Sequence, residues 1–315
     1  MAGEKRGVTN AVPWVPSTRR GGPAWAYVAL TLASILWGTG FFFGKIALRE
    51  VSVGHLVLYR FLFACLVLLP IVLRQRVAVA RTDIPAFVVA GILGVPVQFL
   101  LQFSGLARTT VSHASVVIGT LPVMLALAAS YFARERLHPR DWVALAASSA
   151  GVVLIVLGAR RDTAGGASMA GDLLVVLSMM AAVVWILISQ RLVRVYSAVV
   201  TTTYSYGIGT VVLAAWVWGR DGLPPVRLSP PVWAALAIMG VLCTATTTLL
   251  WNWALQTVPA SRSGIFLNLE PLIGAGLGIM VLRESLRWPV PVGGSLIIAA
   301  ALYFTQAGAR RRPEH

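Results

Sequence analysis

Long apolar segments alternate with short polar ones along most of the chain. A helix that spans a bilayer needs about 20 mostly apolar residues, and such runs recur almost from end to end. They predict ten spans, at about 25–47, 54–73, 84–104, 109–132, 141–158, 171–190, 198–218, 231–253, 260–282 and 288–307. The segments between them are short and often hold Pro, Gly or Arg, which favour turns and helix ends. The pattern therefore predicts an all-α polytopic membrane protein.

One stretch of the chain has a weaker copy upstream. Residues 254–286 align without a gap on residues 105–137, at a distance of 149 residues, and seven of 33 positions are identical. The matches include Pro122 on Pro271, which interrupt their spans midway, and an Arg-Glu dipeptide at the end of each span. These are architectural positions, so the pattern indicates a duplicated membrane domain.

The duplication divides the chain into two halves of five spans each. We expect the repeats at 25–158 and 171–307, with a linker at 159–170. Because five is odd, the second half enters the membrane from the opposite side, which makes the ten helices two inverted five-helix repeats. Secondary transporters use this arrangement around a site at the bilayer midplane. Residues 1–24 and 308–315 are predicted to be cytoplasmic tails, the first disordered and the second basic.

Composition and charge agree with a membrane location. The chain is 57% hydrophobic and 12% charged, against about 45–50% apolar and about 25% charged in soluble domains. The net charge of +15 comes from basic residues that flank apolar segments, so we expect no nucleic-acid partner. With both termini cytoplasmic, the inner segments hold sixteen Lys and Arg and the outer ones nine, as the positive-inside rule requires. The expected location is the bacterial inner (cell) membrane.

Two charged residues lie deep within predicted spans, where charges are costly. Glu270 lies at the centre of the ninth span, directly before Pro271, whose ring leaves a backbone carbonyl one turn earlier without a donor. We interpret Glu270 as a cavity residue that takes up a proton or pairs with a cation; the alternative is a structural carboxylate, capped by helix-end donors or paired with Arg60. Arg60 in turn either attracts a carboxylate-bearing substrate or makes a structural ion pair or reaches toward the outer surface.

Uncharged polar and aromatic residues offer further binding groups. Gln98 and Gln102 are one turn apart and share a helix face, and Trp37 and Trp185 lie at equivalent depths of the first and sixth spans. An aromatic pocket with a few amides suits a small amphipathic solute, although helix packing explains each residue equally well. The candidate substrate-binding or gating residues are Trp37, Tyr59, Arg60, Gln98, Gln102, Pro122, Trp185, Tyr204, Trp251, Asn252, Asn268, Glu270 and Pro271.

Three groups of residues resemble a known family. They are Leu36-Trp37-Gly38 in the first span, Leu58-Tyr59-Arg60-Phe61 in the second, and the Pro…Arg-Glu-x-Leu block that ends the fourth and ninth. Together with the duplicated layout, they resemble the EamA-type members of the drug/metabolite transporter superfamily. The resemblance covers about residues 25–307. It implies a ten-helix carrier with a central cavity, similar to relatives that export amino acids, metabolites or drugs.

The function that we expect is secondary transport, and not enzymatic activity. The carrier would export small organic solutes by alternating access around a midplane cavity. The sequence holds no G-x-x-x-x-G-K-[ST] loop and no H-E-x-x-H motif, so we expect neither nucleotide nor metal as a cofactor. The alternatives are a membrane-embedded lipid-modifying enzyme and a non-transporting membrane scaffold. The expected partners are a small-molecule substrate, the lipid bilayer and, for Glu270, a coupled proton; a monomer and a homodimer both remain open.

Overall fold

A computed structural model gives the architecture of most of the chain. It describes residues 23–75, 77–108, 118–132, 137–159, 169–273, 277 and 288–310. Throughout these ranges the regular secondary structure is helical, without a strand. The two predicted tails and the predicted linker fall almost entirely outside the described residues, as do the Arg-Glu dipeptides at 134–135 and 283–284. The prediction of an all-α protein is confirmed for the part that the structure describes.

The first three predicted spans form long helical segments. Helix α1 covers Pro23–Ala47 and α2 covers Val53–Gln75. The third span is continuous but changes its winding midway, from α3 (Ile84–Ile92) through the π-helical turn η1 (Leu93–Val97) to α4 (Gln98–Leu106). Pro96 lies inside η1. Because proline lacks a backbone N–H, it cannot continue the regular α-helical ladder, and the local change of winding accommodates it.

The next helices follow the predicted apolar runs closely. They are α6 (Leu121–Phe132), α7 (Pro139–Ala159), α8 (Met169–Val195) and α9 (Ala198–Asp221). The sharp boundary between α8 and α9 has a local cause. Ser197 is extended and its side chain accepts a hydrogen bond from the backbone N–H of Val200, at 3.2 Å, which is the N-cap geometry that begins a new helix.

The segment after α9 repeats the winding change of the third span. Helix α10 (Pro230–Gly240) passes through the π-helical turn η2 (Val241–Thr246) into α11 (Thr247–Ala254). Here two threonine hydroxyls donate to carbonyls five residues back, from Thr244 to Met239 at 2.7 Å and from Thr246 to Val241 at 2.9 Å. These bonds supply donors to carbonyls near the irregular turn.

The predicted ninth span begins with short elements of different winding. They are α12 (Ala260–Ser263), the 3₁₀ turn η3 (Gly264–Asn268) and a helical turn at 269–273 that carries Glu270 and Pro271. A pre-proline residue disfavours the α conformation, which fits a change of winding near this point. Helix α14 (Pro289–Arg310) is the last element.

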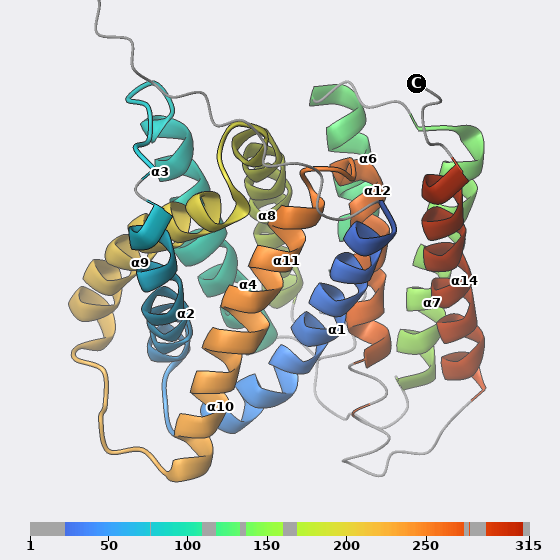
Figure 1. Ribbon diagram of the computed structural model, residues 1–315. Coiled ribbons are helices and arrows are strands. Elements are labelled where there is room, and N and C mark those ends of the chain that lie inside the picture. The colour runs from blue at the N-terminus through green and yellow to red at the C-terminus, as the bar shows by residue number, and fades with distance from the viewer. Residues whose placement is uncertain are drawn as a thin grey trace, which may run out of the picture.

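The helices form one bundle in which neighbours along the sequence are often not neighbours in space. Figure 1 shows α7 and α14 side by side at one edge of the bundle and α9 at the opposite edge. Helices α7 and α14 pack closely against each other. A Cβ on Gly151 of α7 would lie 2.5 Å from the carbonyl oxygen of Gly293. Glycine thus permits a helix–helix approach that any larger residue would prevent.

Six helical segments in the described part of the chain are long and apolar enough to cross a membrane. They are Ala24–Gly44, Val53–Gln75, Ile84–Leu106, Met169–Leu192, Ala198–Asp221 and Pro230–Ala254. Two shorter apolar helices, Leu121–Phe132 and Pro291–Tyr303, fall within two other predicted spans. Many large apolar side chains also remain exposed on these helices, such as Leu66, Val211 and Trp218, as expected of surfaces that face lipid. The count of ten spans stays a prediction.

Candidate functional site

A cavity lies among helices from both ends of the chain. Its apolar and aromatic wall is lined by Trp37, Gly40, Phe99, Phe103, Ile118, Leu121, Met179, Ala182, Trp185, Ile186, Tyr206 and Leu267. Four further residues of the lining carry charge or amide groups: Arg60, Gln98, Gln102 and Glu270. A mainly apolar wall with a few polar groups is typical of small-molecule sites. Six of the predicted site residues thus meet here, from α1, α2, α4, α8 and the turn at 269–273.

The two tryptophans of the lining, among the three predicted, belong to different helices. Trp37 belongs to α1, where its ring centroid is 5.3 Å from that of Trp251 at a tilt of 52°. Trp185 belongs to α8 and its indole lies against Gly94, where a Cβ would come within 2.6 Å of Nε1. The backbone of η1 therefore supports the Trp185 ring directly, and only glycine leaves room for it.

Arg60 is buried beside the π-helical turn η2. Its side chain donates from Nε to the Thr244 hydroxyl and from Nη2 to the Cys243 carbonyl, the latter at 3.0 Å. Its guanidinium carbon lies 4.4 Å from the ring centroid of Phe99, a distance that favours cation–π attraction. Arg60 is 4% exposed, so the alternative in which it reaches toward the outer surface is wrong.

Glu270 lies at the wall of the same cavity. Among the basic residues whose side chains the structure describes, Arg60 included, none lies within 4.0 Å of its carboxylate. The structural ion pair between Glu270 and Arg60 is therefore not formed in this structure. Gly38 of α1 packs against the backbone of Glu270, where a Cβ would meet its carbonyl oxygen at 3.0 Å. This close approach places the middle of the broken ninth span against α1.

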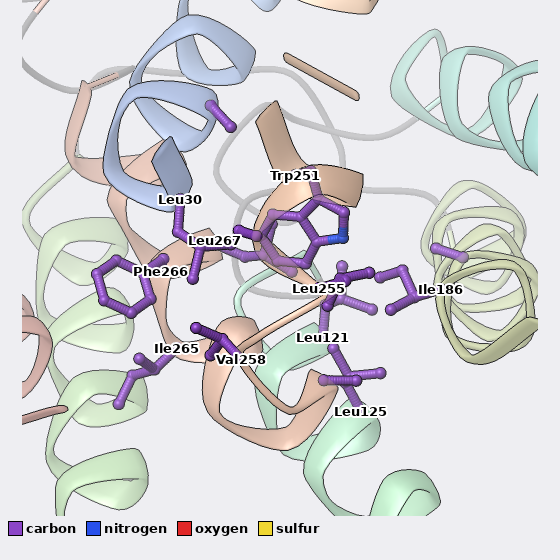
Figure 2. Close-up of a cluster of buried hydrophobic side chains, with 14 of the residues drawn as sticks. Leu30, Leu121, Leu125, Ile186, Trp251, Leu255, Val258, Ile265, Phe266 and Leu267 are labelled. Atoms are coloured by element: carbon purple, nitrogen blue, oxygen red, sulfur yellow. The ribbon is translucent and has the colours of Figure 1, made fainter. Parts of the chain in front are cut away.

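Three other predicted residues tie helices together outside the cavity lining. Trp251 is fully buried, and Figure 2 shows its indole among side chains of α1, α8 and η3. The Asn252 amide donates to the Thr202 hydroxyl at 2.9 Å, and the Asn268 amide donates to the Ser148 hydroxyl at 2.8 Å. Pro122 and Pro271 also lie outside the lining. These residues lie between helices or outside the described lining, and a role for them in binding or gating stays a prediction.

Tyr59, another predicted site residue, belongs to a set of polar contacts at the N-terminal end of α2. Its hydroxyl donates to the Pro225 carbonyl at 2.8 Å, and the Ser52 hydroxyl donates to Asp221 at 2.9 Å. Near them, a serine in the loop before α10 donates from its backbone N–H to the carboxylate of Glu50 at 2.8 Å, and hydrogen bonds from the side chain and the backbone of this serine lower the pKa of Glu50. We call this set the first clasp; it joins the α1–α2 turn to the loop between α9 and α10.

Tyr204, the remaining predicted residue, belongs to a matching set at the C-terminal end of α2. Its hydroxyl contacts the Val77 carbonyl at 3.5 Å, and the Ser197 hydroxyl donates to Gln75 at 3.0 Å. The Tyr196 hydroxyl donates to Asp83 at 2.7 Å. We call this set the second clasp; it joins the α8–α9 turn to the loop between α2 and α3. Tyr59 and Tyr204 are thus structural ties at opposite ends of α2.

Most of the cavity's apolar lining was missed by sequence reasoning, yet one signal was available. Two pairs of lining residues lie 149 positions apart, Ile118 with Leu267 and Leu121 with Glu270, and Trp37 lies 148 positions before Trp185. The alignment that first marked Glu270 therefore also marked Leu121. Nothing in the pattern distinguished Phe99, whose role depends on the position of Arg60 in space.

Within the described ranges, no group of three or more His, Cys, Asp or Glu residues is placed to hold a metal ion. Cys65 and Cys243 are free thiols. The polar groups of the cavity are amides, one guanidinium, one phenol and one carboxylate, a set that binds organic solutes by hydrogen bonds and charge.

Comparison with known proteins places the chain in a family. The model of the EamA-like transporter family matches residues 24–157 and again residues 169–306. An uncharacterized transporter of Archaeoglobus fulgidus is 28% identical over 284 residues, which cover 89% of this chain and 97% of that protein. A biotin transporter of Escherichia coli is 25% identical over 283 residues, 87% of this chain and 91% of its own.

A solved crystal structure shows the same fold. It covers 90% of this chain and 98% of its own, with a TM-score of 0.76 at 21% identity. The matches to the family model span most of the sequence, and the apolar helices described above indicate several membrane crossings. The resemblance seen in the sequence is thereby confirmed, and this multi-pass membrane protein belongs to the EamA-like transporter family.

Proposed function

We propose that the protein is a secondary transporter that moves small organic solutes, such as amino acids, metabolites or drugs, by alternating access around the described cavity. Its ten spans form two inverted five-helix repeats. It lies in the bacterial inner membrane with both termini cytoplasmic, works in the direction of export and has no enzymatic activity. The two matches to the family model, at 24–157 and 169–306, support the division into repeats.

The observation that carries the proposal is that both repeats contribute residues to the wall of one cavity. Residues at equivalent positions of the two repeats line the same space: Trp37 with Trp185, and Leu121 with Glu270. Inverted repeats bring equivalent positions together at their pseudo-twofold axis, near the bilayer midplane, where secondary transporters bind their substrates. A site at this place is accessible from either face when one group of helices moves against the rest.

Two helix crossings support the inverted arrangement. A Cβ on Gly91 of α3 would lie 2.5 Å from the Ser205 carbonyl oxygen, and one on Gly240 of α10 would lie 2.6 Å from that of Arg60. The glycines are 149 positions apart and the carbonyls 145. In both cases a π-helical turn follows the glycine within three residues. The same close crossing therefore occurs twice. In one crossing the first repeat supplies the glycine and the second repeat the carbonyl, and in the other crossing the roles are exchanged.

The lining supports the solute class. Aromatic and aliphatic side chains dominate it, and the amides of Gln98 and Gln102 add hydrogen-bonding groups, which suits small amphipathic molecules. The biotin transported by the E. coli relative belongs to this size class. Glu270 is the acidic group of the described lining, and we propose the proton as the coupled ion.

Proteoliposomes containing the purified protein test the proposal. We expect saturable uptake of at least one member of a panel of amino acids, vitamins and drugs, counterflow by unlabelled solute, and a change in flux when a pH gradient is imposed. Flux that neither saturates nor shows counterflow would indicate a channel. Absence of flux for the whole panel would favour the scaffold alternative, and a flux that ignores every gradient would indicate uniport.

A further inference from the structure

We propose that the cavity selects small carboxylate anions, that Arg60 is their anchor, and that a carboxylate binds when Glu270 has taken up a proton. This inference rests on the proposed transport function and deepens it by naming the substrate class. It is carried by the hydrogen bonds that Arg60 makes and leaves unmade, and by the presence of two opposite charges at one cavity without an ion pair.

Arg60 has donors to spare where it faces the cavity. A guanidinium carries five N–H groups, and the described residues accept from two of its nitrogens, Nε and Nη2. Nη1 has no acceptor among them. The bonds to Cys243 and Thr244 hold one edge of the guanidinium in place, and Arg60 is among the residues that line the cavity; we infer that the free end of its guanidinium points there. That end is the part of arginine that binds a carboxylate through two parallel hydrogen bonds.

The charge of Arg60 is also uncompensated at short range. No carboxylate lies within 4.0 Å of it in the part of the chain that the structure describes. A buried cation in an apolar surrounding is stabilised by an anion that displaces water and supplies hydrogen bonds. The position equivalent to Arg60 in the other repeat is Ser205, so the shared architecture of the repeats does not require a cation here.

Glu270 controls whether Arg60 is available. Both groups line one cavity, so an ionised Glu270 attracts the guanidinium and repels an entering carboxylate. A protonated Glu270 does neither. The other titratable groups described around these two are the phenol of Tyr206 and the thiol of Cys243, which are neutral donors at ordinary pH. Binding of one carboxylate is therefore linked to the uptake of one proton by Glu270 from the solvent. Solute and proton then cross together, so export proceeds where the outward solute gradient exceeds the inward proton gradient.

The uncharged lining defines the rest of the substrate. Trp37, Trp185 and Phe99 provide flat apolar surface, and the buried side-chain oxygen of Gln98 has no donor among the described residues. We therefore expect a substrate with a carboxylate at one end and an apolar or aromatic body that carries a hydrogen-bond donor.

Binding to the detergent-solubilised full chain tests the anchor. The probes share one ring and differ in charge: indole-3-acetate, indole-3-acetamide and tryptamine, with biotin as a second carboxylate. We expect a carboxylate to bind more tightly than the neutral and cationic probes. We expect Arg60→Gln to weaken its binding about tenfold to a hundredfold, the effect of losing hydrogen bonds to a charged group. Tighter binding of tryptamine, or no binding by either carboxylate, would overturn the proposal.

Glu270→Gln tests the competition between Glu270 and the substrate for Arg60. The expected result is tighter binding, whereas misfolding would weaken binding. This variant keeps the size of the side chain and removes its charge, so we expect tighter carboxylate binding at neutral pH and no pH dependence. In the unmodified protein, affinity should rise as pH falls, by up to about tenfold per pH unit for one linked proton. Glu50→Gln, in the first clasp and away from the cavity, is the matched control and should retain the pH dependence.

The outcomes separate this inference from the proposed function. If Glu270→Gln binds the carboxylate more weakly than the unmodified protein, or keeps its pH dependence, Glu270 does not compete for Arg60. Saturable flux of neutral or cationic solutes alone would leave the transport function in place and exclude carboxylates as the substrate class. Absence of flux for every solute would remove both.

Discussion

Arg60 shows how one residue acquires its role from its surroundings. The sequence placed it seven residues into a predicted span and left its partner open. The structure turns it toward η2, where the Cys243 carbonyl and the Thr244 hydroxyl accept its hydrogen bonds. Glu270, marked in the sequence by its depth and by Pro271, lies at the same cavity. Both residues could be nominated from sequence because a charge inside an apolar run is a local signal, whereas their common location depends on packing.

A glycine supports the cavity's second tryptophan, and this gives a prediction at the residue scale. Gly94→Ala places a methyl group within 2.6 Å of the Trp185 indole nitrogen, so the ring must shift. We expect a loss of transport and a destabilisation of about 1–3 kcal/mol, typical of overpacking. Gly207→Ala is the control, because a Cβ there meets nothing within 4 Å. Transport assays and thermal unfolding in detergent measure both; equal behaviour of the two variants would contradict the role assigned to Gly94.

At the scale of elements, the two clasps join α2 and α9 and the loops next to them. The first and second clasps use a serine and a tyrosine each, Ser52 and Tyr59 in one, Ser197 and Tyr204 in the other, 145 positions apart. The residues that accept these hydrogen bonds in the first clasp are separated from those in the second clasp by nearly the same number of positions in the sequence. Both clasps are closed in the one conformation that the structure gives. We infer that α2 and α9 stay joined while other helices move.

A cross-link tests this inference at the scale of elements. In the double variant Ser52→Cys/Asp221→Cys, a short bifunctional thiol reagent joins the α1–α2 turn to the end of α9. We expect transport to continue at close to the uncross-linked rate, because the two segments move together. Each single-cysteine variant treated with the same reagent controls for the adduct itself. A cross-link that stops transport, and whose cleavage restores it, would show that the first clasp opens during the cycle.

At the scale of the whole molecule, the described helices form an irregular bundle around the cavity. The broken ninth span, from α12 to the turn at 269–273, approaches α1 at Gly38. Helices α7 and α14 also contact this span, at its 3₁₀ turn η3 (Figure 1). Six described segments are long and apolar enough to cross a membrane. The proposed inverted topology places the two clasps on opposite faces of the bilayer, since they lie at opposite ends of α2.

Accessibility of introduced cysteines tests that topology. Ala78 lies exposed in the loop of the second clasp, and Leu223, 76% exposed, lies in the loop of the first. In intact cells a membrane-impermeant maleimide should label Leu223→Cys and should label Ala78→Cys only after permeabilisation. The unmodified protein, with Cys243 buried and Cys65 partly buried, sets the background. Labelling of both positions from outside would contradict the placement of the two clasps on opposite faces of the bilayer. The reverse pattern would show that the protein is inserted in the opposite orientation.

The sequence by itself determined that this is a helical membrane protein of a transporter family, and it nominated the six polar and aromatic residues that meet at the cavity. Hydropathy over about 20 residues and similarity between two segments are properties of the chain in one dimension, so no structure was needed to read them. Tertiary structure alone decided which nominated residues share a cavity. Trp251, Asn252 and Asn268 pack between helices, whereas Gln98 and Gln102 line the space, because the direction that each side chain takes depends on how its helix is rotated against its neighbours.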